Sequence, residues 1–354
     1  MNEELVKELN LSLKLILDER KDSINSFGDW EVRAFKELDK IIDSNRDIRP
    51  EVIDRFIGDG IFVTEQPSAT IKGINLNNKL FYLFMKFLTL AVGAKRAGVK
   101  EAKLTFDELK NQDMLALLEK YPMPDTGRPL KISHKGCLFT NRYLRHVYFA
   151  SVFNKYLKER LPHDPIILDI GSSYGLFQRF IKKEMPGSHN ILVEIPGQLI
   201  LALYYLKKEF PDAKIASLAD VNNELIIDEK FVRQYDFILV PTTMYHKLVI
   251  TEVDVVTNFI SLSEMSKEWF DVYVNSIPFK AAKYFYTANR YDSFPTYSNG
   301  LTIFDFPLSE YKKIVFKTLP ILKSYYLPFV FFLTKKMRFS SEVFQFIGEK
   351  KNLK

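Results

Sequence analysis

The periodicity of apolar and polar residues changes along the chain and divides it into two regions. Before residue 125 or so, apolar side chains recur at the three- and four-residue spacing of amphipathic helices, which predicts a helical N-terminal region. The helices predicted there cover residues 5–16, 29–43, 80–94 and 105–121. The last is expected to begin at Thr105, because Thr105 and Glu108 have the S/T-x-x-E spacing of a capping box.

A segment rich in turn-forming residues separates the two regions. It runs from Pro122 to Pro129 and has the composition of a linker. We therefore expect an N-terminal helical region over residues 1–128 and a second domain over 129–354. The pattern within the second domain predicts a lead-in helix over about 141–161, a core over 164–306 and closing strands over 307–354.

Beyond Pro165, short and fully apolar runs alternate with helical patterns. The runs predict strands over 166–170, 190–194, 236–240, 253–257 and 283–286, and helices are predicted over 176–184, 198–210 and 263–274. Strands that are apolar on both faces and alternate with helices indicate an α/β fold with a parallel sheet covered on both sides. A further strand is predicted over 214–218 with its place left open, and antiparallel closing strands over 314–317 and 329–333.

Composition indicates a globular protein and excludes several other classes. The 354 residues are 47% apolar and 27% charged, as in globular domains. The single cysteine, Cys137, excludes a disulfide framework and a cysteine-based zinc site, and it favours a buried spectator thiol over a nucleophile. The five histidines lack H-x-x-x-H and H-E-x-x-H spacing, so no dedicated metal site is expected, although a cation held by carboxylates stays open.

The absence of targeting signals and the net charge limit where the protein is expected to be located and which partners it is expected to bind. The N-terminus is acidic without an apolar signal region, and Leu80–Ala94 is interrupted by Lys86 and too short to span a bilayer, so a cytoplasmic protein is expected. A net charge of +6 allows an acidic partner such as a nucleotide, a phosphate or an anionic membrane without requiring one. Nucleic acid is not expected as a partner, while peripheral membrane contact and a homo-oligomer stay open.

The segment with the clearest chemistry follows the first predicted strand. Gly171 and Gly175 allow a tight turn at the carboxyl edge of the sheet, where open α/β sheets bind ligands. Glu194 ends the next strand, where an acid would accept hydrogen bonds from ribose hydroxyls. The Gly-x-x-x-Gly spacing fits the G-x-G-x-x-G of dinucleotide sites poorly. Residues 169–175 instead have the D/E-x-G-x-G-x-G form of loops that bind S-adenosylmethionine, with Ser173 at the middle glycine; a turn without a ligand is the alternative.

Four segments, in this order, resemble the sugar O-methyltransferase family of class I S-adenosylmethionine-dependent enzymes. The resemblance covers about residues 164–290. The matching segments are Asp169–Gly175 against E-I-G-G-G-Y-G, Val193–Leu206 against V-D-L-P-E-x-L-x-L-A-x-Y-Y-L, Val253–Met265 against D-L-F-I-N-x-x-S-F-Q-E-M, and Phe285–Arg290 against F-Y-x-x-N-R. The sequence departs from the family at Ser172 and Ser173, which replace two glycines, and at Ser263, which replaces a glutamine.

The resemblance implies a fold, a cofactor and a binding loop. The fold would be a Rossmann-like class I methyltransferase sheet, mostly parallel with an antiparallel C-terminal strand, with the N-terminal helical region covering the substrate pocket. The cofactor would be S-adenosylmethionine, and the acid that precedes the loop would orient its amino-acid end. The residues expected to bind it are Asp169, Gly171, Ser172, Ser173, Tyr174, Gly175, Glu194 and Asn258.

The implied reaction is methyl transfer to a sugar hydroxyl, in the synthesis of a surface polysaccharide or glycolipid. The hydroxyl must lose its proton during attack, so a general base is expected. Glu264 is the first candidate, and the alternative is that Ser261 and Glu264 form a capping box at a helix start. His246 is the second candidate, and the alternative is a surface histidine.

The expected acceptor is a sugar or glycoconjugate, either free or linked to a nucleotide or a lipid. Its candidate ligands are Asn289, Arg290, Tyr291 and Tyr297. Arg290 would hold a diphosphate or carboxylate, or else form a structural ion pair. Aromatic residues make up 14% of the chain and are frequent from 284 on, where they would offer flat faces to a sugar. A few of those over 291–306 are expected at the acceptor site, and core packing is the alternative. The rival functions are methyl transfer to another small-molecule or lipid-linked acceptor, a non-catalytic scaffold, and an NAD-dependent oxidoreductase.

Overall fold

A computed structural model describes residues 3–23, 42–49, 53, 94–293, 299–321 and 342–351. The helices predicted over 29–43 and 80–94 lie outside the described residues apart from their last positions, and the strand predicted over 329–333 lies outside them entirely. The division into an N-terminal region and a second domain stays a prediction.

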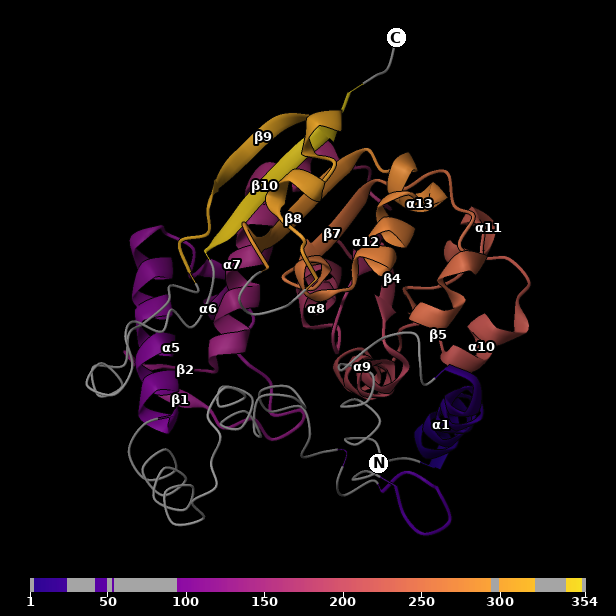
Figure 1. Cartoon of the computed structure of the whole chain (residues 1–354). Coiled ribbons are helices and arrows are strands. Elements are labelled where there is room, and N and C mark those ends of the chain that lie inside the picture. Colours follow the sequence, from indigo (N-terminus) through magenta and orange to yellow (C-terminus); the bar gives the residue numbers. More distant parts are fainter. Residues whose placement is uncertain are drawn as a thin grey trace, which may run out of the picture.

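A single mixed sheet organises the described part of the chain (Figure 1). Its eight strands in these residues are ordered β5-β6-β4-β3-β7-β8-β10-β9. Their bounds are β3 Ile166–Ile170, β4 His189–Glu194, β5 Ile215–Ala216, β6 Phe237–Pro241, β7 Val255–Phe259, β8 Tyr284–Arg290, β9 Tyr311–Thr318 and β10 Val343–Lys350. The pairs from β5 to β8 are parallel, whereas β10 runs antiparallel to β8 and β9. This order confirms the predicted mostly parallel sheet with an antiparallel end.

The apolar strands are buried on both faces, as their sequences require. In β3, Ile167 packs into one hydrophobic cluster and Leu168 into the cluster on the other face, because successive side chains of a strand point to opposite sides. The extra strand predicted over 214–218 is the edge strand β5, which pairs with β6. β7 starts two residues later than predicted, and β8 continues to Arg290.

Helices cover both faces of the sheet. One face packs against α7 (Asn141–Tyr156), α8 (Leu176–Glu184) and α9 (Pro196–Glu209). The other packs against α11 (Glu229–Val232), α12 (Lys267–Val274) and α13 (Ile277–Ala281). From the N-terminal region, α1 (Glu3–Ser23) lies against α9 and α10 (Leu218–Asn223), and α5 (Ala94–Asn111) lies against α7 (Figure 1).

Two predicted helix boundaries are wrong. Thr105 does not start a helix, because α5 runs through it and α6 (Ala116–Lys120) forms a separate helix. The Thr105 hydroxyl instead donates to Asn141 Oδ1, and the neighbouring Phe106 is buried in the core, so packing continues the helix across the capping pattern. The helix predicted over 263–274 is also broken, since a 3₁₀ turn over Leu262–Glu264 precedes α12.

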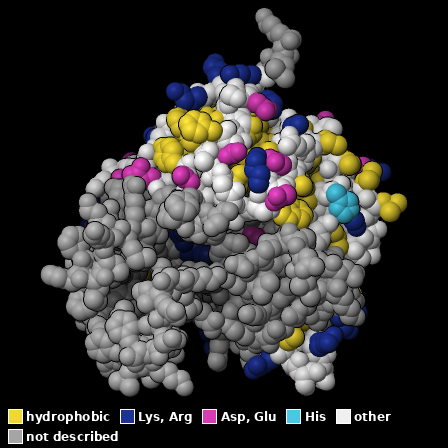
Figure 2. Space-filling model, in the orientation of Figure 1, with side chains coloured by type: hydrophobic (Ala, Val, Ile, Leu, Met, Phe, Trp, Pro, Cys, Tyr) yellow, Lys and Arg dark blue, Asp and Glu magenta, His cyan; other side chains and the backbone are white. Residues whose placement is uncertain are grey.

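The linker between the two regions contains no regular secondary structure. Pro122–Pro129 has no helix or strand, and a short hairpin of β1 (Ile132–His134) and β2 (Cys137–Phe139) follows it, with Cys137 half-buried. None of the helices in the described ranges combines the length and hydropathy that a bilayer crossing needs. On the face shown in Figure 2, basic and acidic side chains are mixed over the described surface, in keeping with 50 Lys and Arg against 44 Asp and Glu.

Candidate functional site

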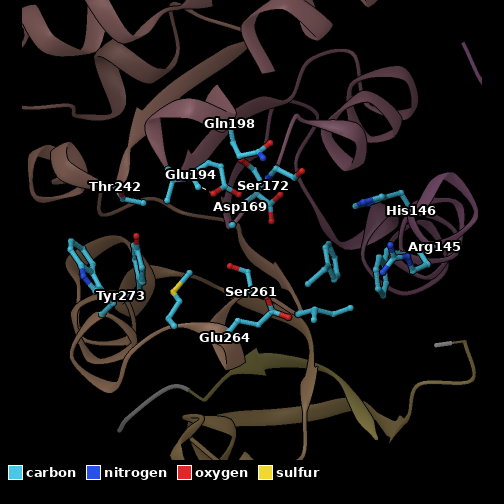
Figure 3. Close-up of a pocket in the computed structure, with 18 of the residues that line it drawn as sticks. Arg145, His146, Asp169, Ser172, Glu194, Gln198, Thr242, Ser261, Glu264 and Tyr273 are labelled. Carbon is cyan, nitrogen blue, oxygen red and sulfur yellow. Dashed lines mark hydrogen bonds between the residues drawn. The ribbon is translucent and has the colours of Figure 1, made fainter. Parts of the chain in front are cut away.

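A cavity of about 490 Å³ opens at the carboxyl ends of β3, β4 and β7. The chain leaves β3 toward β4 on one side and later returns to β7 on the other, so the cavity lies at a topological switch point. Figure 3 shows Arg145 and His146 on one side of it and Thr242 and Tyr273 on the opposite side. The volume is in the range of small-molecule and cofactor sites.

The glycine turn after β3 forms part of the cavity wall. Gly171 has φ +76°, and its amide donates to the Val193 carbonyl at 2.8 Å, which ties the turn to β4. A Cβ atom at Gly171 would lie 2.0 Å from Ser261 Oγ, so only glycine fits between this turn and the segment that follows β7. Gly175 has φ +84° and begins α8, and it lies outside the cavity lining.

Glu194 points into the cavity from the end of β4 (Figure 3). Its Oε2 accepts a hydrogen bond from the Ser173 amide at 2.8 Å, and its Oε1 accepts one from the Ile195 amide at 2.8 Å. Burial raises the pKa of Glu194, while these two amides and the charge of Arg142 oppose the rise. The carboxylate is thus held in place by backbone, and each oxygen keeps a second lone pair for another donor.

Asp169 lies at the floor of the cavity and is buried. Thr257 Oγ1 donates to its Oδ1 at 2.6 Å, and the Gln178 amide donates to its Oδ2. Burial raises the pKa of Asp169 to about 7, against the opposing effect of these two hydrogen bonds. The side chain therefore titrates near neutral pH.

Several cavity-lining residues have buried polar atoms without a hydrogen-bond partner among the described residues. Three of these atoms are Ser172 Oγ, Gln198 Oε1 and Thr242 Oγ1. Buried polar groups in folded proteins are normally satisfied, so unpaired atoms that line one cavity indicate a polar ligand or ordered water. Gln198 and Thr242 were not identified from the sequence, because neither lies in a recognisable ligand-binding pattern.

Asn258 and Asn289 lie behind the cavity wall, outside its lining. Asn258 Nδ2 donates to the Ile170 carbonyl at 2.5 Å, and its Oδ1 accepts from Asn289 Nδ2 at 2.7 Å and from the Leu262 amide at 3.2 Å. Asn289 Oδ1 accepts from the Ser263 amide at 3.0 Å. Both amides are used in connecting β3, β7 and β8 to the turn after β7, so their predicted contacts with cofactor and acceptor find no support in this geometry.

Glu264 and Arg290 both line the cavity and form an ion pair, with Arg290 Nη2 3.3 Å from Glu264 Oε1. The capping alternative for Glu264 is wrong, because the Ser261 side chain caps no backbone amide and Ser266 is the N-cap of α12. The structural ion pair considered for Arg290 is present, with Glu264 as its partner.

The remaining predicted residues that the structure describes lie away from the cavity. His246 is exposed in a 3₁₀ turn, and Tyr291 bonds through its hydroxyl to Thr318 Oγ1 at 3.1 Å. Tyr174 is buried with its ring edge-on to Tyr205 and is not a lining residue. Tyr297 lies outside the described residues.

Among the described residues, the aromatic side chains that line the cavity come from segments other than the predicted 291–306. Phe149 stacks on Phe259 with centroids 4.2 Å apart, and Trp269 and Tyr273 from α12 line the far end. Among the described residues of 284–306, Tyr284, Phe285 and Tyr286 are instead buried in the core, because β8 is covered on both faces. The prediction of the acceptor site rested only on where aromatic residues cluster along the sequence. Which aromatic side chains face a cavity is decided by tertiary packing.

Ile260 follows Phe259 in the cavity wall with φ +72°, which is rare for a β-branched residue. Its amide donates to the Ala288 carbonyl at 2.6 Å, and its carbonyl accepts from the Ser263 hydroxyl at 3.1 Å. Strained backbone of this kind persists where surrounding contacts enforce it, and it is common at functional sites.

A stripe on α7 supplies lining residues that the sequence reasoning missed. Arg142, Arg145, His146 and Phe149 all line the cavity, at the i, i+3, i+4 and i+7 spacing of one helix face. The available signal was two arginines and a histidine on one face of an otherwise apolar helix. Burial, together with the charges of Arg142 and Arg145, holds the pKa of His146 well below its usual range.

In the described ranges, no group of three or more His, Cys, Asp or Glu side chains is arranged to hold a metal ion. Acids that the sequence left unplaced have structural roles. Asp254 Oδ2 accepts from the Ile166 amide at 2.9 Å, and Asp220 forms a capping box with Ser217 at the start of α10.

No protein-family model matches the chain, and no curated protein sequence matches it. Solved structures match at low identity. TrmK from M. capricolum, in complex with S-adenosyl-homocysteine, is 8% identical with a TM-score of 0.32 over 59% of this chain and 71% of that chain. A 30S ribosomal A1408 methyltransferase from an uncultured bacterium is 13% identical with a TM-score of 0.29, over 63% of this chain and 100% of that chain. The precorrin-6y C5,15-methyltransferase from Geobacter metallireducens is 13% identical with a TM-score of 0.30, over 62% and 94%.

Proposed function

We propose that this protein is an S-adenosylmethionine-dependent methyltransferase that acts on a sugar hydroxyl. The observation that carries the proposal is the convergence of two elements on one cavity of about 490 Å³. These are the glycine turn after β3 and the carboxylate of Glu194 after β4. An acid placed there accepts ribose hydroxyls in nucleoside-binding α/β proteins.

The residues around the cavity fit this cofactor. Glu194 keeps free lone pairs toward the cavity, and the unpartnered atoms of Ser172, Gln198 and Thr242 offer further hydrogen bonds to a nucleoside. Trp269 and Tyr273 supply flat apolar faces for an adenine ring. The Gly-x-x-x-Gly spacing lacks the third close glycine that a pyrophosphate needs, which favours a cofactor without phosphate.

When bound, this cofactor supplies an activated methyl group, so the chain must align an acceptor oxygen and remove its proton. We propose Glu264 as the general base, because its carboxylate lines the cavity and the ion pair with Arg290 favours the ionised form. His246 is not retained for this role, since it is exposed and lies outside the cavity lining.

The sugar acceptor rests on the resemblance of residues 164–290 to sugar O-methyltransferases. The cavity has the chemistry that a sugar needs, with the stacked rings of Phe149 and Phe259 beside charged and polar groups. Synthesis of a surface polysaccharide or glycolipid would use such a reaction. Methyl transfer to another small molecule is the alternative acceptor class.

Calorimetry with S-adenosylmethionine tests the proposal. We expect wild type to bind, and Glu194→Gln to bind about tenfold or more weakly, because charged hydrogen bonds to the ribose are lost. Glu159→Gln, at an exposed glutamate, is the matched control and should bind as wild type does. No detectable binding to wild type at millimolar ligand would overturn the proposal and favour a non-catalytic scaffold.

A second variant separates cofactor binding from general-base catalysis. Glu264→Gln should keep the cofactor affinity of wild type and lose turnover by about a hundredfold or more, since general-base catalysis contributes about 10²–10⁴. Turnover is measured with labelled cofactor against a panel of nucleotide sugars and oligosaccharides. Turnover that survives in Glu264→Gln would show that another group removes the proton.

A further inference from the structure

The basic stripe on α7 forms one end of the cavity. Arg142, Arg145 and His146 project from three successive positions of one helix face, and Figure 3 shows Arg145 and His146 directed at the cavity. The charges of both arginines act on His146, which places the two guanidinium groups close to its ring. Both arginines therefore line the same end of the cavity.

Arg142 is connected to the glycine turn. Its Nη1 donates to Ser173 Oγ at 3.0 Å, and its guanidinium lies 5.8 Å from the centroid of the Tyr174 ring. Its Nε is buried without a hydrogen-bond partner among the described residues. The salt bridges in the described part of the chain do not include Arg142, so its charge is not neutralised by a carboxylate in contact with it.

The contacts of the cavity carboxylates are with groups other than Arg142. Glu264 pairs with Arg290, and both oxygens of Glu194 accept backbone amides. Asp169 is held by Thr257 and Gln178 and is partly protonated at neutral pH. The α7 end of the cavity thus carries two guanidinium groups, and the buried Nε of Arg142 offers a donor to an incoming anion.

We propose that Arg142 and Arg145 form an oxyanion site, in which guanidinium groups bind a carboxylate or phosphate of a ligand beside the glycine turn. Guanidinium groups bind both anions through paired N–H donors. Two sources are consistent with the position: the methionine carboxylate of the cofactor and an anionic group of the acceptor. The assignment of the first source rests on the proposed function.

The first experiment compares two nucleosides. S-adenosylhomocysteine carries the amino-acid carboxylate, and 5′-methylthioadenosine lacks it. Both are titrated calorimetrically into wild type, Arg142→Gln, Arg145→Gln and the control Lys155→Gln, which removes an exposed positive charge from the same helix. A cofactor carboxylate predicts that an arginine variant loses about tenfold or more for S-adenosylhomocysteine and less than about twofold for 5′-methylthioadenosine.

The second experiment tests the acceptor source. Pyrophosphate is titrated into the same four proteins, both alone and in the presence of S-adenosylhomocysteine. An acceptor anion predicts that wild type and Lys155→Gln bind pyrophosphate, while an arginine variant binds it about tenfold or more weakly. Arg142→Lys and Arg145→Lys, which keep the charge but lose the paired donors, should fall between wild type and the glutamine variants.

The outcomes separate the two proposals. The oxyanion site is overturned if neither arginine variant differs from Lys155→Gln in either experiment. It is also overturned if the arginine variants bind both nucleosides equally more weakly and bind pyrophosphate as Lys155→Gln does. If pyrophosphate binds through the arginines while wild type binds neither nucleoside, the oxyanion site stands and the methyltransferase proposal fails. Thermal unfolding of each variant shows that a lost affinity does not reflect a lost fold.

Discussion

Ser173 adopts φ +53° in a turn where the resembling family has glycine. A left-handed conformation costs a residue with a side chain about 1–2 kcal/mol. Two contacts offset this cost: the Ser173 amide donates to Glu194 Oε2 at 2.8 Å, and its hydroxyl accepts from Arg142 at 3.0 Å. The serine thereby connects the turn to both the acid after β4 and the basic stripe of α7.

Gly171 is the position in this turn that tolerates no side chain. Gly171→Ala should lower the free energy of unfolding by more than the 1–2 kcal/mol of left-handed strain, because the new Cβ would meet Ser261 Oγ at 2.0 Å. Gly136→Ala is the matched control, since Gly136 has φ +81° and open space where a Cβ would lie. Urea denaturation of both variants measures the difference, and equal losses would contradict the close approach.

Asp169 makes stability depend on pH. Because burial raises its pKa to about 7, the folded protein keeps a proton that the unfolded chain releases above about pH 4. The stability that the protonated Asp169 side chain contributes is fully present at low pH and is lost as the pH rises toward 7. Asp169→Asn should remove this slope, so the stability of the variant rises relative to that of wild type between about pH 4 and 7, by at most about 1.4 kcal/mol per pH unit.

Denaturation of both proteins across this pH range checks the expectation. Gln178 helps the variant fold, because its buried Oε1 lacks a partner among the described residues and an amide flip would let it accept from the new side chain. Parallel stability profiles for the two proteins would show that Asp169 titrates as an ordinary carboxyl.

At the scale of elements, asparagine side chains connect the turn after β7 to the neighbouring strands. Asn289 Nδ2 donates to Asn258 Oδ1 at 2.7 Å, and its Oδ1 accepts from the Ser263 amide at 3.0 Å. These bonds fix Glu264, which follows in the same turn, relative to β8. The segment thus acts as a rigid part of the cavity wall.

Asn289→Ala should destabilise the protein by about 1–3 kcal/mol for each buried group left unpaired, here the Ser263 amide and part of Asn258. Asn223→Ala, at an exposed asparagine of α10, should change stability by less than about 0.5 kcal/mol. Chemical denaturation compares the two. A loss at Asn289 no larger than that at Asn223 would mean that water satisfies the Ser263 amide.

At the scale of the molecule, one arginine joins the linker to three helices. Arg179 on α8 donates to Glu209 Oε2 on α9 at 2.8 Å, to the Tyr143 hydroxyl on α7 at 2.9 Å and to the Pro122 carbonyl at 3.3 Å. Because α8 follows the glycine turn and α7 carries the basic stripe, this side chain helps to fix the two ends of the cavity relative to each other.

Arg179→Met should lower the free energy of unfolding by about 3 kcal/mol, since the mostly buried carboxylate of Glu209 loses its cation and keeps only the Thr126 hydroxyl as a donor. Arg233→Met removes an exposed partner of Asp164 and should cost at most about 1 kcal/mol. Equilibrium unfolding in urea distinguishes them. Similar small losses would indicate that Glu209 gains water when Arg179 is removed.

The strand–turn–helix unit and the acid after the next strand could be predicted because each is a local pattern. A fully apolar run of five residues specifies a buried strand, and α8 has the predicted bounds Leu176–Glu184. The same local reasoning failed at Thr105, where a capping pattern lies inside α5. There, the burial of Phe106 in the core outweighs a cap that contributes about 1 kcal/mol.

The sequence by itself determined the order of strands and helices, the close turn at Gly171 and the acid at Glu194, because periodicity and glycine act within one segment. Tertiary structure decided which side chains share the cavity. It turned Asn258 and Asn289 toward each other behind the wall and brought the α7 stripe of Arg142, Arg145 and His146 onto the glycine turn. The physical reason is that a helix face is chosen by what packs against it, and that partner lies far away in the sequence.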